Sequence, residues 1–384
     1  MTSKHIYFVA GEASADNHGA ALMRSLREQD PRIQFFGRGG PQMRAVADGQ
    51  FNDWIAHAAV VGLWDVLRSY GYFRKKFQET LDEIDRTNPS AVVLIDYPGF
   101  NLRLARALRR RKFSRKIIYY ISPQVWAWNR GRIVHMARWI DLMLCIFPFE
   151  ADLFNQAGLR TRFVGHPMID RLAARKITAR RDPDLIGLFP GSRKREIRKI
   201  FPVLVKVMER LHALRPGLRF EVGAVSPEIA STIKTMLGEN RYSDLEIQIN
   251  TGDSAGLMQR AQVGVVASGS ATLEAAYFRL PFVLIYKLAW LSYIAARIVV
   301  RVDYIGMPNL LAGKEVVPEF IQHQASPDKI ARTLLSFIDT EAKRKEMICE
   351  FDQVMQQLGD GGGSELAANE IMSELNAASP ASAI

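Results

Sequence analysis

The amino-acid sequence predicts an α/β fold in which two parallel β-sheets each carry helices on both faces. Short apolar runs alternate with longer amphipathic segments along the chain, and this alternation is typical of strand–helix–strand units in a covered parallel sheet. The pattern restarts after residue 184, and a chain of 384 residues exceeds what one hydrophobic core usually organises. We therefore expect two domains of ordinary size.

The first domain is expected to span residues 1–175. Its strands are predicted where apolar runs occur, at His5–Ala10, Ile33–Phe36, Ala91–Ile95, Ile117–Ile121 and Leu142–Phe147. Stretches long enough for a helix separate these runs. Parallel strands need such crossover connections, so the spacing itself favours a parallel sheet.

The second domain is expected to span residues 176–355 and repeats the pattern. Its strands are predicted at Leu185–Phe189, Leu218–Val222, Leu245–Ile249, Val263–Ala267 and Phe282–Tyr286. The segment Arg193–Leu214 has apolar residues every three to four positions, which predicts a helix with one buried face. Residues 356–384 begin with a glycine-rich break and are expected to form a last helix and a frayed tail.

Composition limits the possible functions. The net charge of +11 favours an anionic partner, which could be a nucleic acid, an acidic membrane surface or a phosphorylated substrate. The two cysteines, Cys145 and Cys349, lack the spacing of metal ligands, so we expect neither disulfides nor a zinc site. The first apolar run is too short for a signal peptide, and no run approaches the roughly 18–20 apolar residues of a transmembrane helix. Any membrane contact is therefore expected to be peripheral, and a reducing cytoplasm fits best.

Two turns rich in small residues occur in the second domain, each between an apolar run and an expected helix. They are Gly191-Ser192-Arg193 and the segment Ser268–Glu274. Backbone N–H groups at the start of a helix are unpaired and carry a partial positive charge, and small residues let an anion approach them. Ligands of open α/β sheets bind beyond the carboxyl ends of the strands. The two turns together therefore predict a site for the diphosphate of a nucleotide.

The side chains of the second turn divide by role. Gly269 and Ala271 permit a ligand to come close, Ser270 and Thr272 supply hydroxyl donors, and Glu274 could accept hydrogen bonds from ribose. The alternative is that both turns are ordinary strand-to-helix connections. Glu274 would then be a first-turn carboxylate favoured by the helix dipole.

Acidic residues follow two strands of the first domain. Asp96 ends a buried strand, where a carboxylate is well placed for general-base catalysis. The alternative is that Asp96 caps the helix that begins near Asn101. The loop after the first strand offers Glu12, Ser14 and Asp16, and its two carboxylates compete with Asp96 for the role of base. Asp16 is also a plausible helix N-cap.

Three further motifs have more than one interpretation. The segment Ser122–Trp128 places two tryptophans after a strand, where they could line an apolar or sugar-binding wall or lie in the core. Asp182-Pro-Asp184 resembles a metal-binding Asp-x-Asp motif but precedes a strand, so we expect neither a metal nor a cofactor. The helical pattern of residues 62–77 carries Trp64, Leu67 and Phe73 beside basic residues. It suits either a membrane-surface helix or a buried amphipathic helix.

The chain resembles the lipid-A-disaccharide synthase family, glycosyltransferases with two Rossmann-like domains of the GT-B type. The resemblance spans nearly the whole chain, and its motifs occur in the family's order: Gly11-Glu-Ala-Ser-Ala-Asp16, Ile95-Asp-Tyr-Pro-Gly-Phe-Asn101, Ser122–Trp128, Phe147-Pro-Phe-Glu150, Gly165-His-Pro167, Pro190-Gly-Ser-Arg193, Ser268–Glu274 and Pro308-Asn-Leu-Leu-Ala-Gly313. The first motif departs from the family, which has glycine where this chain has Ala15. If φ is positive there, alanine costs roughly 1 kcal/mol and shifts the loop.

The resemblance implies a reaction and its substrates. UDP-2,3-diacylglucosamine and 2,3-diacylglucosamine 1-phosphate (lipid X) would give a β-1,6-linked disaccharide 1-phosphate and UDP, with Asp96 as the base in an inverting attack. Arg193, the amides near Gly191 and Ser192, and the helix start at Ser270 would stabilise the departing UDP. Asn309 would contact the nucleotide or the donor sugar. The enzyme would work at the cytoplasmic face of the inner membrane without a cofactor, a metal or nucleic acid, and its oligomeric state is left open.

Three other functions compete with this interpretation. Another GT-B enzyme acting on a UDP-sugar, such as a peptidoglycan glucosaminyltransferase or a UDP-sugar epimerase, would share the nucleotide site. A basic nucleic-acid-binding protein would fit the charge of +11, but no such motif occurs. A noncatalytic lipid-binding homologue would fit the change at Ala15.

Overall fold

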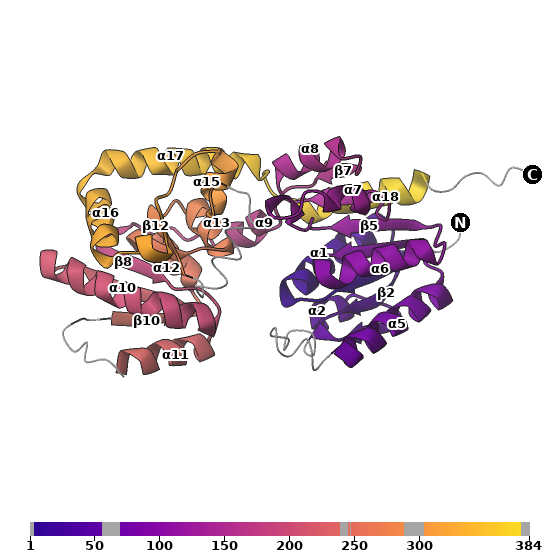
Figure 1. Ribbon diagram of the computed structural model, residues 1–384, viewed down its shortest axis with the longest axis horizontal. Helices are drawn as coiled ribbons and strands as arrows, with labels where there is room; N and C mark the ends of the chain where they lie inside the picture. Colours follow the sequence, from indigo (N-terminus) through magenta and orange to yellow (C-terminus); the bar gives the residue numbers. More distant parts are fainter. Residues whose placement is uncertain (1–3, 56–69, 239–244, 246, 288–302, 378–384) are drawn as a thin grey trace, which may run out of the picture. The chain divides into compact units, whose positions relative to one another are not determined.

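The computed structural model describes residues 4–55, 70–238, 245, 247–287 and 303–377 (Figure 1). The chain divides into two compact units, Met1–Pro167 with Leu358–Ile384, and Met168–Gln357. The boundary expected after residue 175 thus falls after Pro167. The C-terminal segment, which we expected to stand apart, returns to the first unit.

The first unit contains a seven-stranded sheet of order β3-β2-β1-β4-β5-β6-β7. Its strands are β1 (His5–Ala10), β2 (Gln34–Gly39), β3 (Phe51–Asp53), β4 (Ala91–Ile95), β5 (Lys116–Tyr120), β6 (Leu142–Cys145) and β7 (Thr161–Phe163). Every neighbouring pair is parallel, as predicted. The two strands that the sequence did not reveal, β3 and β7, are three-residue edge strands.

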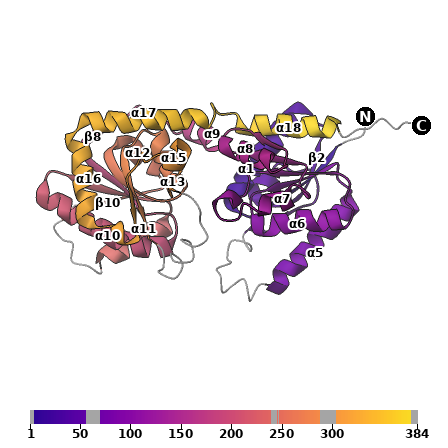
Figure 2. The same cartoon turned by 45° about the horizontal axis from the view of Figure 1, so that its top comes forward.

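Helices pack on both sides of this sheet. They are α1 (Ala13–Gln29), α2 (Pro41–Arg44), α5 (Tyr70–Thr87), α6 (Pro98–Arg110), the 3-10 turn η1 (Val125–Ala127), α7 (Arg132–Met136), α8 (Pro148–Gln156) and α18 (Gly363–Ala377). The C-terminal helix α18 packs against α1 (Figure 2). Its residues Ala367, Ile371 and Leu375 belong to the same buried cluster as the strands. The end of the chain therefore completes the first core.

The second unit contains a six-stranded parallel sheet of order β10-β9-β8-β11-β12-β13. Its strands are β8 (Asp182–Phe189), β9 (Arg219–Ala224), β10 (Ile247–Thr251), β11 (Ala261–Ala267), β12 (Phe282–Tyr286) and β13 (Glu319–Ile321). Its helices are α9 (Met168–Ala173), α10 (Lys194–Leu214), α11 (Pro227–Gly238), α12 (Ser254–Arg260), α13 (Ser270–Tyr277), α15 (Met307–Ala312), the 3-10 turn η2 (Gln322–Gln324), α16 (Pro327–Asp339) and α17 (Glu341–Gln357).

The predicted buried face of α10 is confirmed. The side chains that define it are buried: Ile197, Phe201, Leu204, Val207 and Leu211. The helix packs on α16 and α11, because its apolar residues recur on one side while basic residues occupy the other.

Candidate active site

Each sheet has one point at which the strand order reverses, and ligands of open α/β sheets bind at such points. In the first sheet it lies between β1 and β4, and in the second it lies between β8 and β11. The four loops predicted to carry function follow these four strands, with Glu12 and Asp96 in the first unit and Gly191 and Gly269 in the second. Each pair of loops thus meets at the carboxyl edge of its own sheet.

Asp96 and Tyr97 directly follow β4 in a left-handed backbone conformation, with φ of 46° and 48°. Two successive non-glycine residues of this kind are uncommon and store strain. The strand edge holds them in place, since the Asp96 N–H donates to the carbonyl of Tyr120 at 3.0 Å. The Asp96 carbonyl in turn accepts from Tyr119 Oη and, at 2.8 Å, from Asn101 Nδ2. The backbone that presents the Asp96 carboxylate is therefore fixed by three hydrogen bonds.

The Asp96 carboxylate has the protonation behaviour of a general base. Burial raises its pKa to about 6, and the negative charge of Glu12 contributes in the same direction. The carboxylate is mostly ionised at neutral pH, yet it binds a proton more readily than an ordinary aspartate. Glu12 and Ser14, at the start of α1, are exposed to solvent.

Asp16 has a different position from the one the sequence suggested. Its side chain is buried, and its oxygens accept hydrogen bonds from the backbone N–H groups of Gly40, Gln42 and Met43, each at 2.9 Å. Asp16 thus anchors the turn between β2 and α2. It is neither the N-cap of α1, a position that Glu12 occupies, nor a carboxylate available as a base. Its place in the acceptor site stays a prediction.

The side chain of Asn101 holds the backbone of Asp96 by hydrogen bonds. Its buried side chain donates through Nδ2 to the carbonyls of Ile95 at 3.1 Å and Asp96 at 2.8 Å. The side-chain amide therefore replaces the backbone partners that β4 loses where the chain turns. Asn101 thus helps to fix the backbone that presents Asp96.

In the first motif, an alanine fits at position 15, whereas position 11 has no room for a side chain. Ala15 lies inside α1 and is absent from the residues with positive φ, so the strain that we considered for this position does not arise. Alanine in a helix is instead about 1 kcal/mol more favourable than glycine. Gly11 is the constrained position, because a Cβ there would lie 2.3 Å from the Tyr97 ring.

The loop after β5 is fixed by a buried carboxylate. Glu150 is fully buried and accepts hydrogen bonds from Ser122 Oγ at 2.6 Å, Trp126 Nε1 at 2.8 Å and the Phe147 N–H at 3.3 Å. Burial raises the pKa of Glu150 to about 7, and these hydrogen bonds oppose the rise. Of the two tryptophans in this loop, Trp126 is buried, whereas Trp128 is 46% exposed. One tryptophan therefore belongs to the core and the other remains accessible.

In the second unit, glycines shape the loops at the corresponding edge. Gly191 has φ of 110° and Gly269 has φ of 143°. A Cβ on Gly269 would meet no described atom within 4 Å, so space is open beside the start of α13. Ser192 is exposed, and so is Arg193, whose side chain is 80% exposed and pairs with Glu196 at 3.2 Å. This edge offers a glycine turn followed by an exposed serine and an exposed arginine, which suits an anion.

The remaining residues of the second turn have mixed roles. Ser270 is exposed, and Ser268 and Ala271 are half-buried. Thr272 is buried, and its Oγ1 donates to the Gly269 carbonyl at 2.7 Å, so this hydroxyl stabilises the turn. Glu274 is half-buried and forms an ion pair with Arg171 of α9 at 2.7 Å.

Asn309 is buried in the second unit. Its buried Nδ2 donates to the Val317 carbonyl at 2.7 Å and to Glu319 Oε1 at 2.9 Å. Its Oδ1 accepts from the N–H groups of Val316 and Val317, each at 2.8 Å. Its amide is thus used to tie α15 to β13, and the contact of Asn309 with a nucleotide or donor sugar stays a prediction.

Sequence reasoning missed Tyr119, Glu150 and Tyr286. Tyr119 sits inside an apolar strand, where nothing in the sequence distinguishes it. Tyr286 ends β12, and its pKa is raised by burial and by the negative charge of Glu196, with Arg193 opposing. Glu150 had a usable signal, because a glutamate at the third position of a helix often bonds back to its start.

The Asp-x-Asp motif lies away from this edge. Asp182 is the first residue of β8, whereas the loop of Gly191, Ser192 and Arg193 follows the last residue of this strand. Asp182 forms an ion pair with Arg219. In the described part of the chain, no group of three His, Cys, Asp or Glu side chains is arranged to hold a metal ion.

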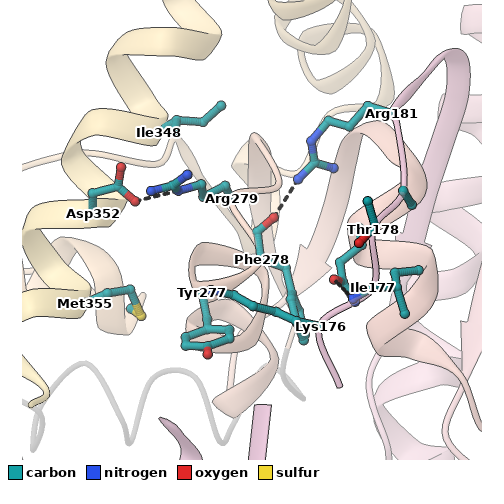
Figure 3. A pocket seen from close by; sticks show the side chains of 12 residues that line it. Lys176, Ile177, Thr178, Arg181, Tyr277, Phe278, Arg279, Ile348, Asp352 and Met355 are labelled. Atoms are coloured by element: carbon teal, nitrogen blue, oxygen red, sulfur yellow. Dashed lines mark hydrogen bonds and ion pairs between the residues drawn. The ribbon is translucent and has the colours of Figure 1, made fainter. Parts of the chain in front are cut away.

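A cavity of about 710 Å³ opens at the amino edge of the second sheet (Figure 3). Arg181 and Lys176 line one side of it, while Arg279 pairs with Asp352 on the other at 2.7 Å. Arg181 donates to the Phe278 carbonyl at 2.6 Å. The cavity contains none of the predicted site residues and is separate from the loops described above.

The residues proposed for membrane contact are only partly described. Trp64 and Leu67 lie outside the described residues, whereas Phe73 is half-buried in α5 with its ring 5.7 Å from that of Tyr72. Among the described helices, none is long and apolar enough to cross a bilayer.

Comparisons with known proteins agree on one family. The family model described as lipid-A-disaccharide synthetase matches residues 6–368. The chain is 38% identical to the lipid-A-disaccharide synthase of Geobacter sulfurreducens over 97% of this chain and 98% of that protein. It is 35% identical to lipid-A-disaccharide synthase 1 of Legionella pneumophila strain Philadelphia 1, covering 93% and 94%.

Solved structures resemble the fold at low sequence identity. A Staphylococcus aureus MnaA–UDP structure has a TM-score of 0.64 at 14% identity, covering 97% of each chain. MurG of Acinetobacter baumannii has a TM-score of 0.57 at 12% identity, covering 96% of this chain and 99% of that one. These likenesses establish the two-domain α/β architecture of GT-B glycosyltransferases and epimerases.

Proposed function

The chain belongs to the lipid-A-disaccharide synthase family, and we propose that it joins UDP-2,3-diacylglucosamine to 2,3-diacylglucosamine 1-phosphate. The products are the β-1,6-linked disaccharide 1-phosphate and UDP. The observation that carries the mechanism is the Asp96 carboxylate, which is held on a strained, fully bonded backbone and has its pKa raised to about 6.

On the acceptor side, Asp96 removes the proton of the 6-hydroxyl as that oxygen attacks the anomeric carbon of the donor. The new bond joins O6 to C1, the bond from C1 to the diphosphate oxygen breaks, and the configuration at C1 inverts. The proton ends on the Asp96 carboxylate. Contacts support this choice among the three acidic candidates, since Asp16 is bound to backbone amides and Glu12 is exposed.

On the donor side, the leaving group is UDP, whose charge grows as the bond breaks. Arg193, the amides of Gly191 and Ser192, and the start of α13 at Ser270 stabilise that charge without a divalent ion. The high exposure of Arg193 and the open space beside Gly269 support this role.

Around these contacts, Ser268 and Ala271 form the wall of the nucleotide site, and Thr272 supports it from within the turn. Glu274 binds the ribose hydroxyls through the carboxylate oxygen that Arg171 leaves available. This arrangement rests on the ion pair that Arg171 makes with Oε1 of Glu274.

Both substrates carry acyl chains, so the enzyme works as a peripheral protein at the cytoplasmic face of the inner membrane. The net charge of +11 favours an anionic surface. The contact assigned to Trp64, Leu67 and Phe73 rests on their helical spacing beside basic residues.

The decisive experiment is mass spectrometry of the products after the purified protein is mixed with both lipids in detergent, with and without EDTA. We expect the disaccharide 1-phosphate and UDP in both samples. Product only in the absence of EDTA would show that a divalent ion takes part. No product from a protein that still binds UDP would argue for another acceptor.

A parallel sample addresses the epimerase alternative, since several structural relatives are UDP-N-acetylglucosamine 2-epimerases. Here the protein is incubated with UDP-N-acetylglucosamine alone. We expect the sugar to be recovered unchanged, and formation of its 2-epimer would contradict the proposed transferase.

A further inference from the structure

The loop after β5 carries two arginines, Arg130 and Arg132, beside the strand that presents Asp96. Strands β4 and β5 are neighbours, and Ile95 pairs with Tyr120 at their carboxyl ends. The loops that leave these strands therefore start side by side. Arg132 begins α7, only a few residues beyond the accessible Trp128.

These arginines differ from two arginines at the end of α6. Arg109 and Arg111, at the end of α6, form ion pairs with Asp141 and Asp85. Arg130 instead donates through Nε to the Trp126 carbonyl at 3.2 Å. The Arg132 guanidinium lies over the Trp128 ring, 5.9 Å from its centroid. Within the described residues, neither is within ion-pair distance of a carboxylate, so their charge remains available to a ligand.

The charge of Arg132 acts on Tyr119, a residue of the strand next to Asp96. It opposes the rise in the pKa of Tyr119, whose hydroxyl donates to the Asp96 carbonyl. The pKa of Asp96 itself is raised by burial and by Glu12. Arg132 follows the strand next to the one that presents Asp96, and its guanidinium contacts the ring of Trp128.

This arrangement fits the chemistry of the acceptor. In a glucosamine 1-phosphate, the 6-hydroxyl and the anomeric phosphate are on different carbons, C6 and C1, with C5 and the ring oxygen between them. An acceptor with its 6-hydroxyl at Asp96 therefore needs a cation near the base but not at its carboxylate. A phosphate dianion is best held by guanidinium groups, which offer paired donors in a plane.

We infer that Arg132, assisted by Arg130, binds the 1-phosphate of the acceptor, with the exposed ring of Trp128 as the adjoining wall. The inference rests on the proposed function and deepens it, because it assigns the preference for a phosphorylated acceptor to a specific side chain. Glu150 holds this loop through Ser122 and Trp126, so the arginines start from a fixed backbone.

The test compares two acceptors, 2,3-diacylglucosamine 1-phosphate and the same lipid without its phosphate, in the wild type and in Arg132→Gln. Hydrogen bonds to charged groups contribute enough for a roughly 10- to 100-fold preference. We expect the wild type to favour the phosphorylated acceptor in kcat/KM by about this factor. Arg132→Gln should lose most of the preference, while its kcat/KM for the phosphate-free acceptor and its affinity for UDP stay unchanged.

Two further variants sharpen the test. Arg138→Gln removes an exposed arginine just after α7 and should leave the preference intact. Arg132→Lys keeps the charge but not the paired donors, and should restore part of the preference.

Three outcomes would contradict the inference. An equal loss with both acceptors would give Arg132 a structural role, and an unchanged preference would place the phosphate elsewhere. Transfer to neither acceptor by the wild type would instead overturn the proposed function, and the inference with it.

Discussion

The two sheets build their functional edges from opposite kinds of residue. At the β1/β4 point of the first unit, the left-handed positions after the strand are taken by Asp96 and Tyr97, at an estimated strain of about 1–3 kcal/mol each. At the β8/β11 point of the second unit, the positive-φ positions are Gly191 and Gly269, where no such strain arises. Strained backbone positions thus present side chains at the first edge, whereas glycines form the turns of the second edge without strain.

The surroundings of these positions follow the same division. The carbonyl and N–H of Asp96 are bonded to Tyr119, Tyr120 and Asn101, which fixes one geometry. Beside Gly269 the position of a Cβ is open to 4 Å, so the loop leaves room for a ligand. The backbone of the first edge is therefore fixed, whereas the second edge has open space beside its turn.

The largest effect should come from Asp96→Asn, which removes the base at the strained edge. We expect kcat to fall roughly 100-fold or more, as is typical when a general base is lost. Asparagine tolerates positive φ, so the fold should persist and the affinity for UDP, bound at the other sheet, should not change. Steady-state kinetics and calorimetric titration with UDP check both parts. Near-normal turnover would remove Asp96 from this role and with it the proposed contrast between the edges.

Arg193→Ala should have the reverse pattern at the second edge. Loss of a charged donor to the diphosphate should weaken UDP binding about 10- to 100-fold, and kcat/KM should fall with it. Stability should hardly change, because the exposed pair with Glu196 contributes at most about 1 kcal/mol. The matched control is Arg198→Ala, an exposed arginine one turn along the same helix. If UDP bound equally to both variants, Arg193 would not belong to the nucleotide site.

Gly269→Ala tests whether the second edge needs glycine for its backbone. No described atom would clash with the new Cβ, so the cost comes from φ of 143°, about 1–3 kcal/mol in the free energy of unfolding. UDP should also bind more weakly, since the methyl group occupies the ligand's space. Gly217→Ala, with open space and no positive φ, should change stability by less than about 0.5 kcal/mol. Urea unfolding of both variants measures the difference, and equal stability would mean that the glycine is not required.

The division between the edges could be predicted only in part from the sequence. Apolar runs located the strands, and the parallel topology then placed the loops with Asp96, Gly191 and Gly269 at the edges where ligands bind. The short strands β3 and β7 were not predicted, because each has three residues that include polar ones and so forms no apolar run. The packing of α18 in the first unit was not predicted, because its contact with α1 depends on tertiary structure and not on a local sequence pattern.

Polar residues in loops were the least predictable part of the site. Asp16 and Asn309 were assigned to ligands, but each is buried and bonded to backbone amides. A sequence shows that a carboxylate or amide lies in a loop, but not which N–H groups point toward it. That information depends on the turn after β2 for Asp16 and on the approach to β13 for Asn309.

The smallest expected effect concerns the interaction between Glu12 and Asp96, which distinguishes a neighbour of the base from the base itself. Asp96 must be ionised to accept a proton, so kcat/KM should fall about tenfold per pH unit below its pKa of about 6. The charge of Glu12 raises that pKa. Glu12→Gln should therefore move the acid limb to lower pH, by less than about one unit, since close charges in water interact by about 1 kcal/mol.

The rate of Glu12→Gln at neutral pH should stay near that of the wild type, because Asp96 remains ionised there. Glu28→Gln, at an exposed position farther along α1, should leave the acid limb where it is. A collapse of the rate at every pH in Glu12→Gln would make Glu12 the base. The strained backbone at Asp96 would then be explained by the need to place Tyr97, because its ring packs in the space that Gly11 leaves open.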